Sequence, residues 1–145
     1  MLDEEYLKEE YKMFSVDYKV TVSDINYGGH MGNERALLLF QQARIDLFKS
    51  LGVSEINVGD NIGTIQKDAH VYYRAEIYLG DKLKITIKGV EIKKTSINFI
   101  YIVKNESDKV VLEGSTTIVG FDYERKRVTK FSEKFLDTLE DIFIK

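Results

Sequence analysis

The sequence predicts an α+β fold in which one antiparallel sheet wraps around one long central helix. Two patterns predict it. Between residues 36 and 51, apolar residues recur at spacings of three and four, which is typical of a helix with a wide apolar face: Ala36, Leu37, Phe40, Ala43, Leu47, Phe48 and Leu51. From residue 65 to 121, apolar and polar residues alternate in segments separated by turn signals. A single sheet that covers a single helix accounts for both patterns.

The first third of the chain leads into this helix. Residues 2–12 are charged and predict either a short helix or an arm, and residues 14–22 alternate as a half-buried strand does. A polar, glycine-rich loop follows from Asp24 to Asn33. Leu38, Leu39 and Ile45 add apolar residues off the main face, so we expect the helix to be largely wrapped by other structure. Gly52 stands where a helix C-cap belongs.

The remainder reads mainly as strands. Residues 53–63 predict a loop, and strands are predicted over 65–77, 83–87, 97–103 and 110–121. Turns are expected at 79–81, 93–95 and 105–109, and a hairpin at 122–127. Residues 131–144 show helical spacing again, with Ser132 as the N-cap. A curved sheet of this kind leaves an edge strand and an exposed surface that pairing of two subunits would cover.

Composition excludes several classes of function. The 145 residues are expected to form one domain, 1–145, with 43% apolar and 31% charged residues. The net charge of −3 gives no electrostatic reason to expect nucleic acid or an anionic membrane as a partner. Cysteine is absent and only two histidines occur, which argues against a thiolate or histidine-rich metal site. With so few metal-binding side chains of these types, we expect no metal. No apolar run is long enough to span a bilayer, so we expect a cytoplasmic protein.

The loop and helix also resemble a known family. The segment DINYGGHMGN, followed by a helix that contains Ala43-Arg44, resembles the signature of hotdog-fold acyl thioesterases, in the branch of 4-hydroxybenzoyl-CoA and acyl-ACP thioesterases. Their pattern is roughly D-x-D-x-x-G-H-V-N-N. Asp24 matches the first Asp, Gly29 and His30 the Gly-His pair, and Asn33 the second Asn. Two positions differ: Asn26 stands where the usually catalytic Asp is expected, and Gly32 replaces the first Asn.

The resemblance implies roles for several residues. His30 would bind the thioester carbonyl or position water, and the N–H groups of Gly28, Gly29 and Met31 would stabilise the oxyanion. Asn26 would hydrogen-bond water or the carbonyl, although turns also favour Asn. The general base would be Glu76, which matches a glutamate of acyl-ACP thioesterases, or else Glu34 in the first turn of the helix. Asn33 would cap the helix.

The alternatives to these roles are structural. Glu76 also fits a surface glutamate paired with a lysine, and His70 a solvated or interface histidine. Arg44 fits an ion pair with Asp46, Asp24 or a partner chain. Tyr72, Tyr73 and Tyr78 fit packing on the sheet, and the basic pairs at 93–94 and 126–127 fit a solvated surface rather than contacts with the phosphates of coenzyme A or an acidic carrier protein.

The sequence therefore predicts an acyl thioesterase that hydrolyses an acyl-CoA or acyl-carrier-protein thioester without a cofactor. By its resemblance, it would act as a homodimer or homotetramer with each site at a subunit interface. The alternative is a non-catalytic hotdog protein that binds acyl-CoA as a sensor or scaffold, which the Asn at position 26 favours. A weaker third alternative is an enoyl or hydroxyacyl dehydratase, whose usual motif is not visible in the sequence.

Overall fold

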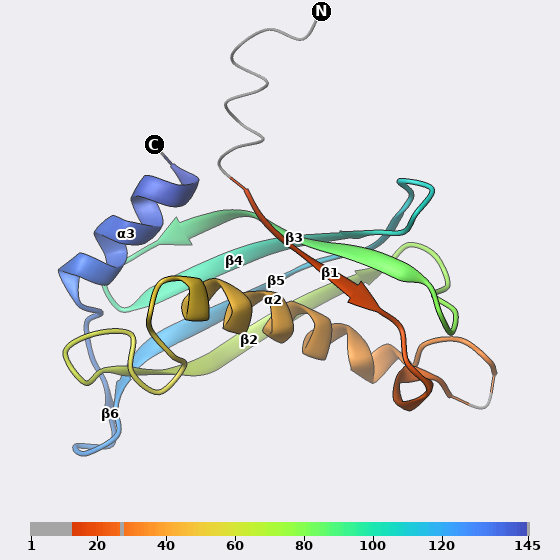
Figure 1. Ribbon diagram of the computed structural model, residues 1–145. Coiled ribbons are helices and arrows are strands. Elements are labelled where there is room, and N and C mark those ends of the chain that lie inside the picture. The colour runs from red at the N-terminus through yellow and green to blue at the C-terminus, as the bar shows by residue number, and fades with distance from the viewer. Residues whose placement is uncertain (1–12, 27, 145) are drawn as a thin grey trace, which may run out of the picture.

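One antiparallel sheet curls around one long helix, as Figure 1 shows for the computed structural model. The structure describes residues 13–26 and 28–144, so the predicted helix or arm at 2–12 lies outside the described residues. The strand order is β1-β3-β4-β5-β2, with β6 paired to β5. The strands are β1 (Phe14–Lys19), β2 (Gly63–Tyr73), β3 (Lys82–Ile92), β4 (Ser96–Lys104), β5 (Val110–Asp122) and β6 (Arg127–Val128).

The long helix α2 (Ala36–Ser50) crosses the concave face of the sheet, and α3 (Glu133–Phe143) covers one end of it. Two short 3-10 helices precede α2, η1 (Val22–Asp24) and η2 (Asn33–Arg35). Alternate residues of β4 turn toward α2 and are fully buried, whereas their neighbours are half-buried. The core therefore lies between α2 and the inner face of the sheet.

The predicted apolar face of α2 is confirmed for most of its members. Ala36, Phe40, Ala43, Leu47 and Phe48 are buried, and Leu39 joins them. The side of the helix away from the sheet is open instead of wrapped: its exposed apolar residues are Leu37, Leu38 and Ile45. Gly52 follows the helix with φ of 75°, which is the left-handed conformation expected at this end of a helix.

The contact between α2 and the sheet is closest at Phe40. Its ring stacks on that of Tyr101, with centroids 4.5 Å apart and planes 8° apart. Its edge fills the space above Gly114, where an added Cβ would lie 2.6 Å from Cε2 and 2.9 Å from Cζ of Phe40. The same Cβ would lie 2.3 Å from the His70 carbonyl oxygen of β2, so only glycine fits at this point of β5.

Two strands are shorter in the structure than the sequence predicts. The strand expected over 14–22 ends at Lys19, because the chain turns into η1 and leaves Val22 exposed. The strand expected over 65–77 runs from Gly63 to Tyr73, with a bulge between Gln66 and Asp68. It stops there because the N–H groups of Arg74 and Ala75 both donate to the carbonyl of Val111, so the regular pairing of β2 with β5 ends. Glu76, predicted to lie on a strand, therefore lies in the segment that connects β2 to β3.

The C-terminal predictions are confirmed. The hairpin expected at 122–127 joins β5 to β6, and the Asp122 carboxylate accepts hydrogen bonds from the N–H groups of Glu124 and Arg125, both at 3.0 Å. Ser132 caps α3, with its Oγ accepting from the N–H of Phe135 at 3.0 Å.

Candidate active site

The glycine-rich loop folds back on itself as a small hairpin. Ile25 pairs with Met31, the N–H of Asn26 donates to the carbonyl of His30 at 3.0 Å, and the N–H of Gly29 donates to the carbonyl of Asn26 at 3.1 Å. The side-chain Oδ1 of Asn26 accepts from the N–H of Gly28 at 2.8 Å. The predicted oxyanion donors on Gly28 and Gly29 thus already have acceptors within the loop in this conformation.

The loop is anchored at its start by Asp24, which is 7% exposed. Its Oδ2 accepts from the Tyr18 hydroxyl at 2.7 Å and from the N–H of Thr21 at 2.9 Å, and Arg35 lies 4.0 Å from Oδ1. Burial alone would raise the pKa of the Asp24 carboxyl, but the hydrogen bonds from Thr21 and Tyr18 and the charge of Arg35 together hold it below its ordinary value. Asp24 is therefore an ionised anchor of the loop.

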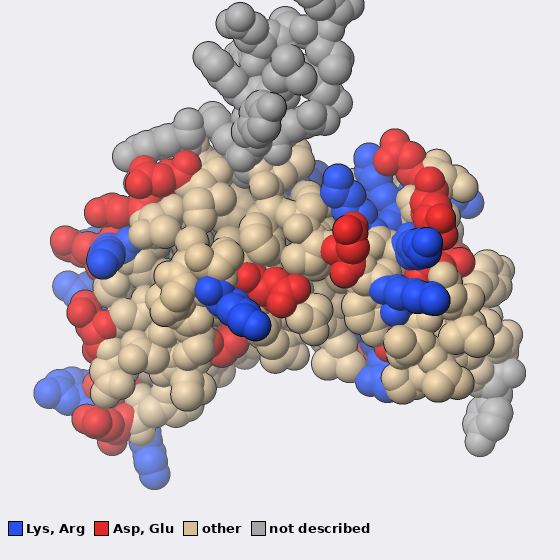
Figure 2. Space-filling model, viewed as in Figure 1, with Lys and Arg blue, Asp and Glu red and all other residues tan. Residues whose placement is uncertain are grey.

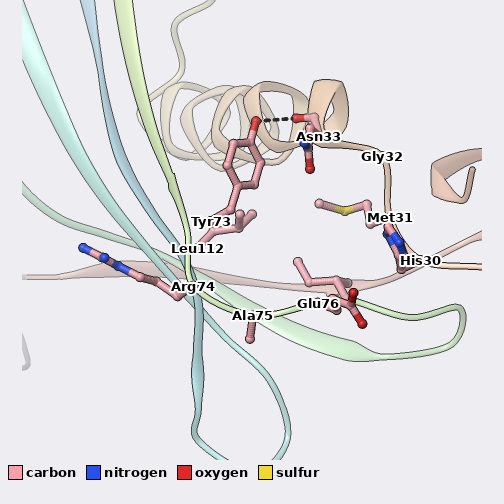
Figure 3. A pocket seen from close by; sticks show the side chains of 10 residues that line it. His30, Met31, Gly32, Asn33, Tyr73, Arg74, Ala75, Glu76 and Leu112 are labelled. Carbon is pink, nitrogen blue, oxygen red and sulfur yellow. Dashed lines mark hydrogen bonds between the residues drawn. The ribbon is translucent and has the colours of Figure 1, made fainter. Parts of the chain in front are cut away.

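A cavity of about 290 Å³ opens beside the loop. Figure 3 shows its two walls, one made by the loop and the start of η2, the other by the segment that follows β2. Its lining comprises His30, Met31, Gly32, Asn33, Leu112 and the five residues from Tyr73 to Ile77. Two hydrogen bonds join the walls, from the N–H of Met31 to the carbonyl of Ile77 at 2.6 Å and from the Tyr73 hydroxyl to the carbonyl of Asn33 at 2.7 Å. Met31, Ile77 and Leu112 make its interior apolar.

His30 and Glu76 lie on opposite walls of this cavity, whose lining also includes the titratable side chains of Tyr73 and Arg74 (Figure 3). Tyr78 connects them: its backbone pairs with that of His30, and its hydroxyl donates to the Glu76 carboxylate. That hydrogen bond, followed by the charge of Glu76, raises the pKa of Tyr78. Among residues 13–26 and 28–144, no side chain or backbone group hydrogen-bonds the His30 ring. The ring is therefore available to a ligand.

The loop also brings Asn26 close to His30. A Cβ placed on Gly28 would lie 2.9 Å from Nε2 of His30 and 3.2 Å from Oδ1 of Asn26, so both polar side chains converge over this glycine. Any larger residue at position 28 would push the imidazole aside. Gly28 therefore has a steric role in addition to the predicted role of its N–H group.

The cavity gathers only part of the predicted set. His30, Met31, Asn33 and Glu76 line it, whereas Asn26, Gly28 and Gly29 lie in the loop behind His30. Glu34 is exposed in η2, with its carboxylate folded over Gly32. The sequence interpretation of Tyr73 and Tyr78 as sheet-packing residues missed their hydrogen bonds to site residues. The only signal in the sequence was their position beside Glu76.

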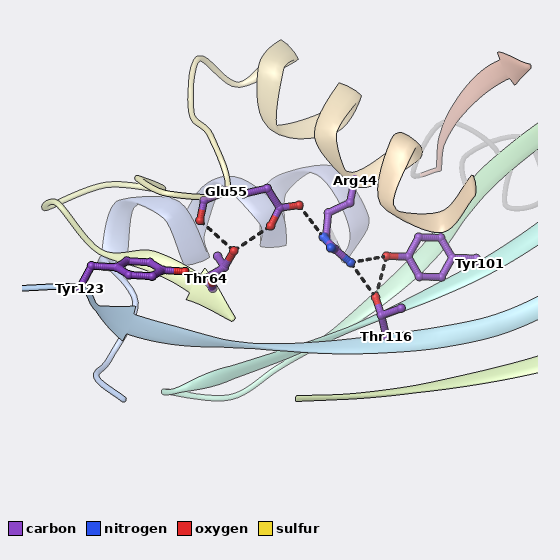
Figure 4. Close-up of polar contacts among 6 residues, drawn as sticks. All are labelled: Arg44, Glu55, Thr64, Tyr101, Thr116 and Tyr123. Carbon is purple, nitrogen blue, oxygen red and sulfur yellow. Dashed lines mark hydrogen bonds and ion pairs between the residues drawn. The ribbon is translucent and has the colours of Figure 1, made fainter. Parts of the chain in front are cut away.

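Arg44 is the buried charge of the helix, and its partner differs from those predicted (Figure 4). Its Nε donates to Glu55 Oε1 at 2.7 Å and its Nη1 to Thr116 Oγ1 at 3.0 Å. The predictions of Asp46 and Asp24 are wrong, because Asp46 accepts from Gln42 and Asp24 belongs to the loop anchor. Glu55 also accepts from Thr64 at 2.7 Å. The network fixes the loop after α2 to the helix and the sheet.

The described part of the chain holds no group of three or more His, Cys, Asp or Glu side chains that could bind a metal ion. Across the same residues, no helix is both long and apolar enough to cross a membrane.

Residues 20–139 match a family model described as the thioesterase-like superfamily. The Bacillus subtilis protein YsmA is 24% identical over 128 residues, which are 87% of this chain and 86% of YsmA.

Solved structures of similar fold include the Staphylococcus aureus protein SAV2348 in complex with CoA (TM-score 0.81, 18% identity, 90% of this chain and 84% of that one). Another is Slr0204, a 1,4-dihydroxy-2-naphthoyl-CoA thioesterase from Synechocystis (TM-score 0.78, 17% identity, 88% and 94%). A third is YbaW, a probable thioesterase from Escherichia coli (TM-score 0.71, 20% identity, 90% and 98%). These similarities show that the fold is the hotdog fold.

Proposed function

Because this chain belongs to the thioesterase-like superfamily, we propose that it hydrolyses an acyl thioester of coenzyme A. The observation that carries the proposal is the cavity in which His30 and Glu76 face each other above an apolar interior. An acyl group fits the apolar part, which places the thioester carbonyl between the two polar side chains. The similarity to a protein solved with CoA and to a CoA thioesterase supports the choice of thiol.

In the proposed reaction, water attacks the thioester carbonyl and the carbon–sulfur bond breaks. Glu76 takes the proton of the water and returns it to the departing thiolate, and the free His30 ring donates to the carbonyl oxygen. Tyr78 holds the Glu76 carboxylate in place through its hydroxyl. The N–H groups of Gly28 and Gly29 serve as oxyanion donors only if they exchange their present acceptors in the loop for the substrate.

The test is thiol release from a panel of acyl-CoA thioesters. Removal of a general base typically costs a factor of about 10²–10⁴ in rate, so Glu76→Gln should lower kcat by that order with little change in substrate affinity. His30→Ala should do at least as much damage. Glu34→Gln should be mild, and Glu91→Gln, at an exposed position of β3, is the matched control. Full activity of Glu76→Gln together with loss of activity in Glu34→Gln would show that the general base is Glu34 in η2 and not Glu76.

We also propose that the active form is a homodimer or a pair of dimers. The exposed apolar side of α2, with Leu37, Leu38 and Ile45, and the free edge of β2 are the surfaces that a second copy would cover. A site beside the start of α2 then receives residues from both chains. A stable, folded monomer in light scattering at micromolar concentration would contradict this assembly.

A second candidate function is binding of acyl-CoA without turnover. Asn26 supports it, because an amide stands where related enzymes carry a carboxylate, and its Oδ1 is held by the N–H of Gly28. Background thiol release from every thioester in the panel, together with measurable acyl-CoA binding, would favour this function over hydrolysis.

A further inference from the structure

Two more hollows continue the cavity along the surface. The first, of about 440 Å³, shares Arg74, Ala75 and Glu76 with the cavity and extends to Tyr78, Asp81, Asn105 and Lys109. We call it the polar hollow, since its side chains are almost all polar. Glu76 thus lines both the cavity with its apolar interior and the polar hollow.

The second hollow, of about 470 Å³, shares Asn105 with the polar hollow. It lies along β1 and β3 and is lined by Lys19, Lys82 and Lys84, by the carboxylates Asp17 and Glu106, and by Tyr18 and Leu83. We call it the lysine hollow. Figure 2 shows Lys and Arg side chains gathered at the end of the molecule where β3 begins, with acidic side chains beside them.

Two of the three lysines of this hollow repel each other across the sheet, whereas the third, Lys84, stands opposite Asp17. Lys19 and Lys82 stand directly opposite each other in the β1–β3 register. Like charges in directly opposite positions of an antiparallel pair are destabilising. Neither lysine forms an ion pair with any residue in the described ranges, whereas nearby Lys104 pairs with Asp108 at 3.4 Å. An anion bound between Lys19 and Lys82 would turn this repulsion into attraction.

The cavity, the polar hollow and the lysine hollow match, in this order, the three parts of an acyl-CoA molecule. Its acyl group is apolar, its pantetheine arm is neutral and carries amides, and its nucleotide carries the phosphates. We infer that the pantetheine arm lies in the polar hollow and that Lys19 and Lys82 bind the phosphates of the CoA nucleotide. The inference rests on the proposed function in taking a CoA thioester as the ligand. It adds two residues that lie outside the loop and outside the lining of the cavity.

Calorimetric binding of CoA and of pantetheine tests this site, because pantetheine has the arm without the phosphates. We expect the unmodified protein to bind CoA at least tenfold more tightly than pantetheine. Lys82→Gln should weaken CoA binding about fivefold, which corresponds to about 1 kcal/mol at 1.4 kcal/mol per tenfold, and change pantetheine binding less than twofold. Lys126→Gln, in the turn between β5 and β6 at the other end of the molecule, is the control. High salt should reduce the preference for CoA.

Thermal stability provides a second, independent readout. Because Lys82 faces Lys19, Lys82→Gln should leave Tm unchanged or raise it while CoA binding falls, a combination that damage to the fold would not produce. Lys19→Gln, on the edge strand β1, gives the same test if Lys82→Gln does not fold.

Equal affinity of the unmodified protein for CoA and pantetheine, or unchanged CoA binding in the lysine variants, would overturn the inference. A carrier protein with the same arm but no nucleotide should displace CoA poorly; equal displacement would also overturn it. Hydrolysis is measured on the same preparations. Lysine-dependent CoA binding without turnover refutes only the proposed hydrolysis, and turnover that is equal for acyl-CoA and acyl-pantetheine refutes only the lysine site.

Discussion

Replacing Arg44 with Met measures how much the charge network of Arg44 contributes to the free energy of unfolding. The side chain of Arg44 is 4% exposed and that of Glu55 is 25% exposed. Methionine keeps the apolar stem of the arginine and removes the guanidinium. The variant loses the hydrogen bonds from residue 44 to Glu55 and Thr116. The Glu55 carboxylate then keeps one hydrogen bond from another side chain, which the Thr64 hydroxyl donates.

The structure sets the expected size of the effect. Breaking a buried ion pair by removing one partner costs about 3–5 kcal/mol, because the other charge is left without compensation. Thr116 and Tyr101 still hydrogen-bond each other at 2.8 Å, and Glu55 has partial access to water. The loss should therefore lie at the lower end, about 3 kcal/mol. For a chain of this length, that lowers Tm by about 6–12 °C.

Thermal and urea unfolding measure this loss, with Arg125→Met as the matched control. Arg125 also pairs with an aspartate, at 3.8 Å, but its side chain is 69% exposed. Its replacement should cost less than about 1 kcal/mol, because exposed pairs contribute little. Glu55→Gln should cost as much as Arg44→Met or more, because it leaves the more deeply buried charge unpaired.

The double variant Arg44→Met, Glu55→Gln completes the cycle. It should be less destabilised than the two single variants added together, since no unpaired charge remains in it. Strict additivity, or a fall in Tm below about 2 °C for Arg44→Met, would refute the view that this network holds the loop after α2 in place.

Three further predictions follow from the core and the loop. Leu47→Asp should prevent folding, since it places an unpaired charge at a fully buried position; an unchanged Tm would contradict this. Asn26→Asp should fold normally and raise thioester hydrolysis, and unchanged or lower turnover would show that Asn26 is adapted to another base. Because the pKa of Asp24 is lowered in the folded state, its contribution to stability is complete above the ordinary value of 3.8 and is lost as pH falls through the folded value. Asp24→Asn should remove this part of acid unfolding, measured by circular dichroism.

The sequence predicted the helix and strands well where burial repeats with a regular period. Leu47 and Phe48 on α2, and Phe99 and Tyr101 on β4, are buried because period-3.6 and period-2 patterns directly report which face meets the core. The end of β2 could not be predicted in this way. Its apolar alternation continues to Ile77, but the regular pairing ends at Arg74, because the N–H groups of Arg74 and Ala75 share the carbonyl of Val111. Such a contact depends on the tertiary structure and leaves no periodic pattern in the sequence.

The site could be predicted only as far as the motif reaches. Gly28 and His30 lie in the predicted loop. The prediction that Asn33 caps the long helix is wrong, because α2 begins at Ala36 after Arg35 and Asn33 lies in η2, where no side chain caps the first turn. The contacts of His30 with Tyr78 and of Asn33 with Tyr73 join segments that are far apart in the sequence. The partner of Arg44 could not be found, because Glu55 lies beyond the end of the helix and reaches it only through the fold of a loop without regular period. The pairing of Lys19 with Lys82 could not be predicted either, because alternation along one strand does not show which other strand it pairs with.

The glycine beneath Phe40 has a consequence for both neighbours of β5. Phe40 and Tyr101 form a flat stack between α2 and the sheet. A Cβ on Gly114 would lie 2.6 Å from Cε2 of Phe40 and 2.3 Å from the His70 carbonyl oxygen of β2. A single methyl group there would therefore disturb the packing of the helix and the pairing of β2 with β5 together. The two elements that lead to the opposite walls of the cavity thus depend on a glycine that lines neither wall.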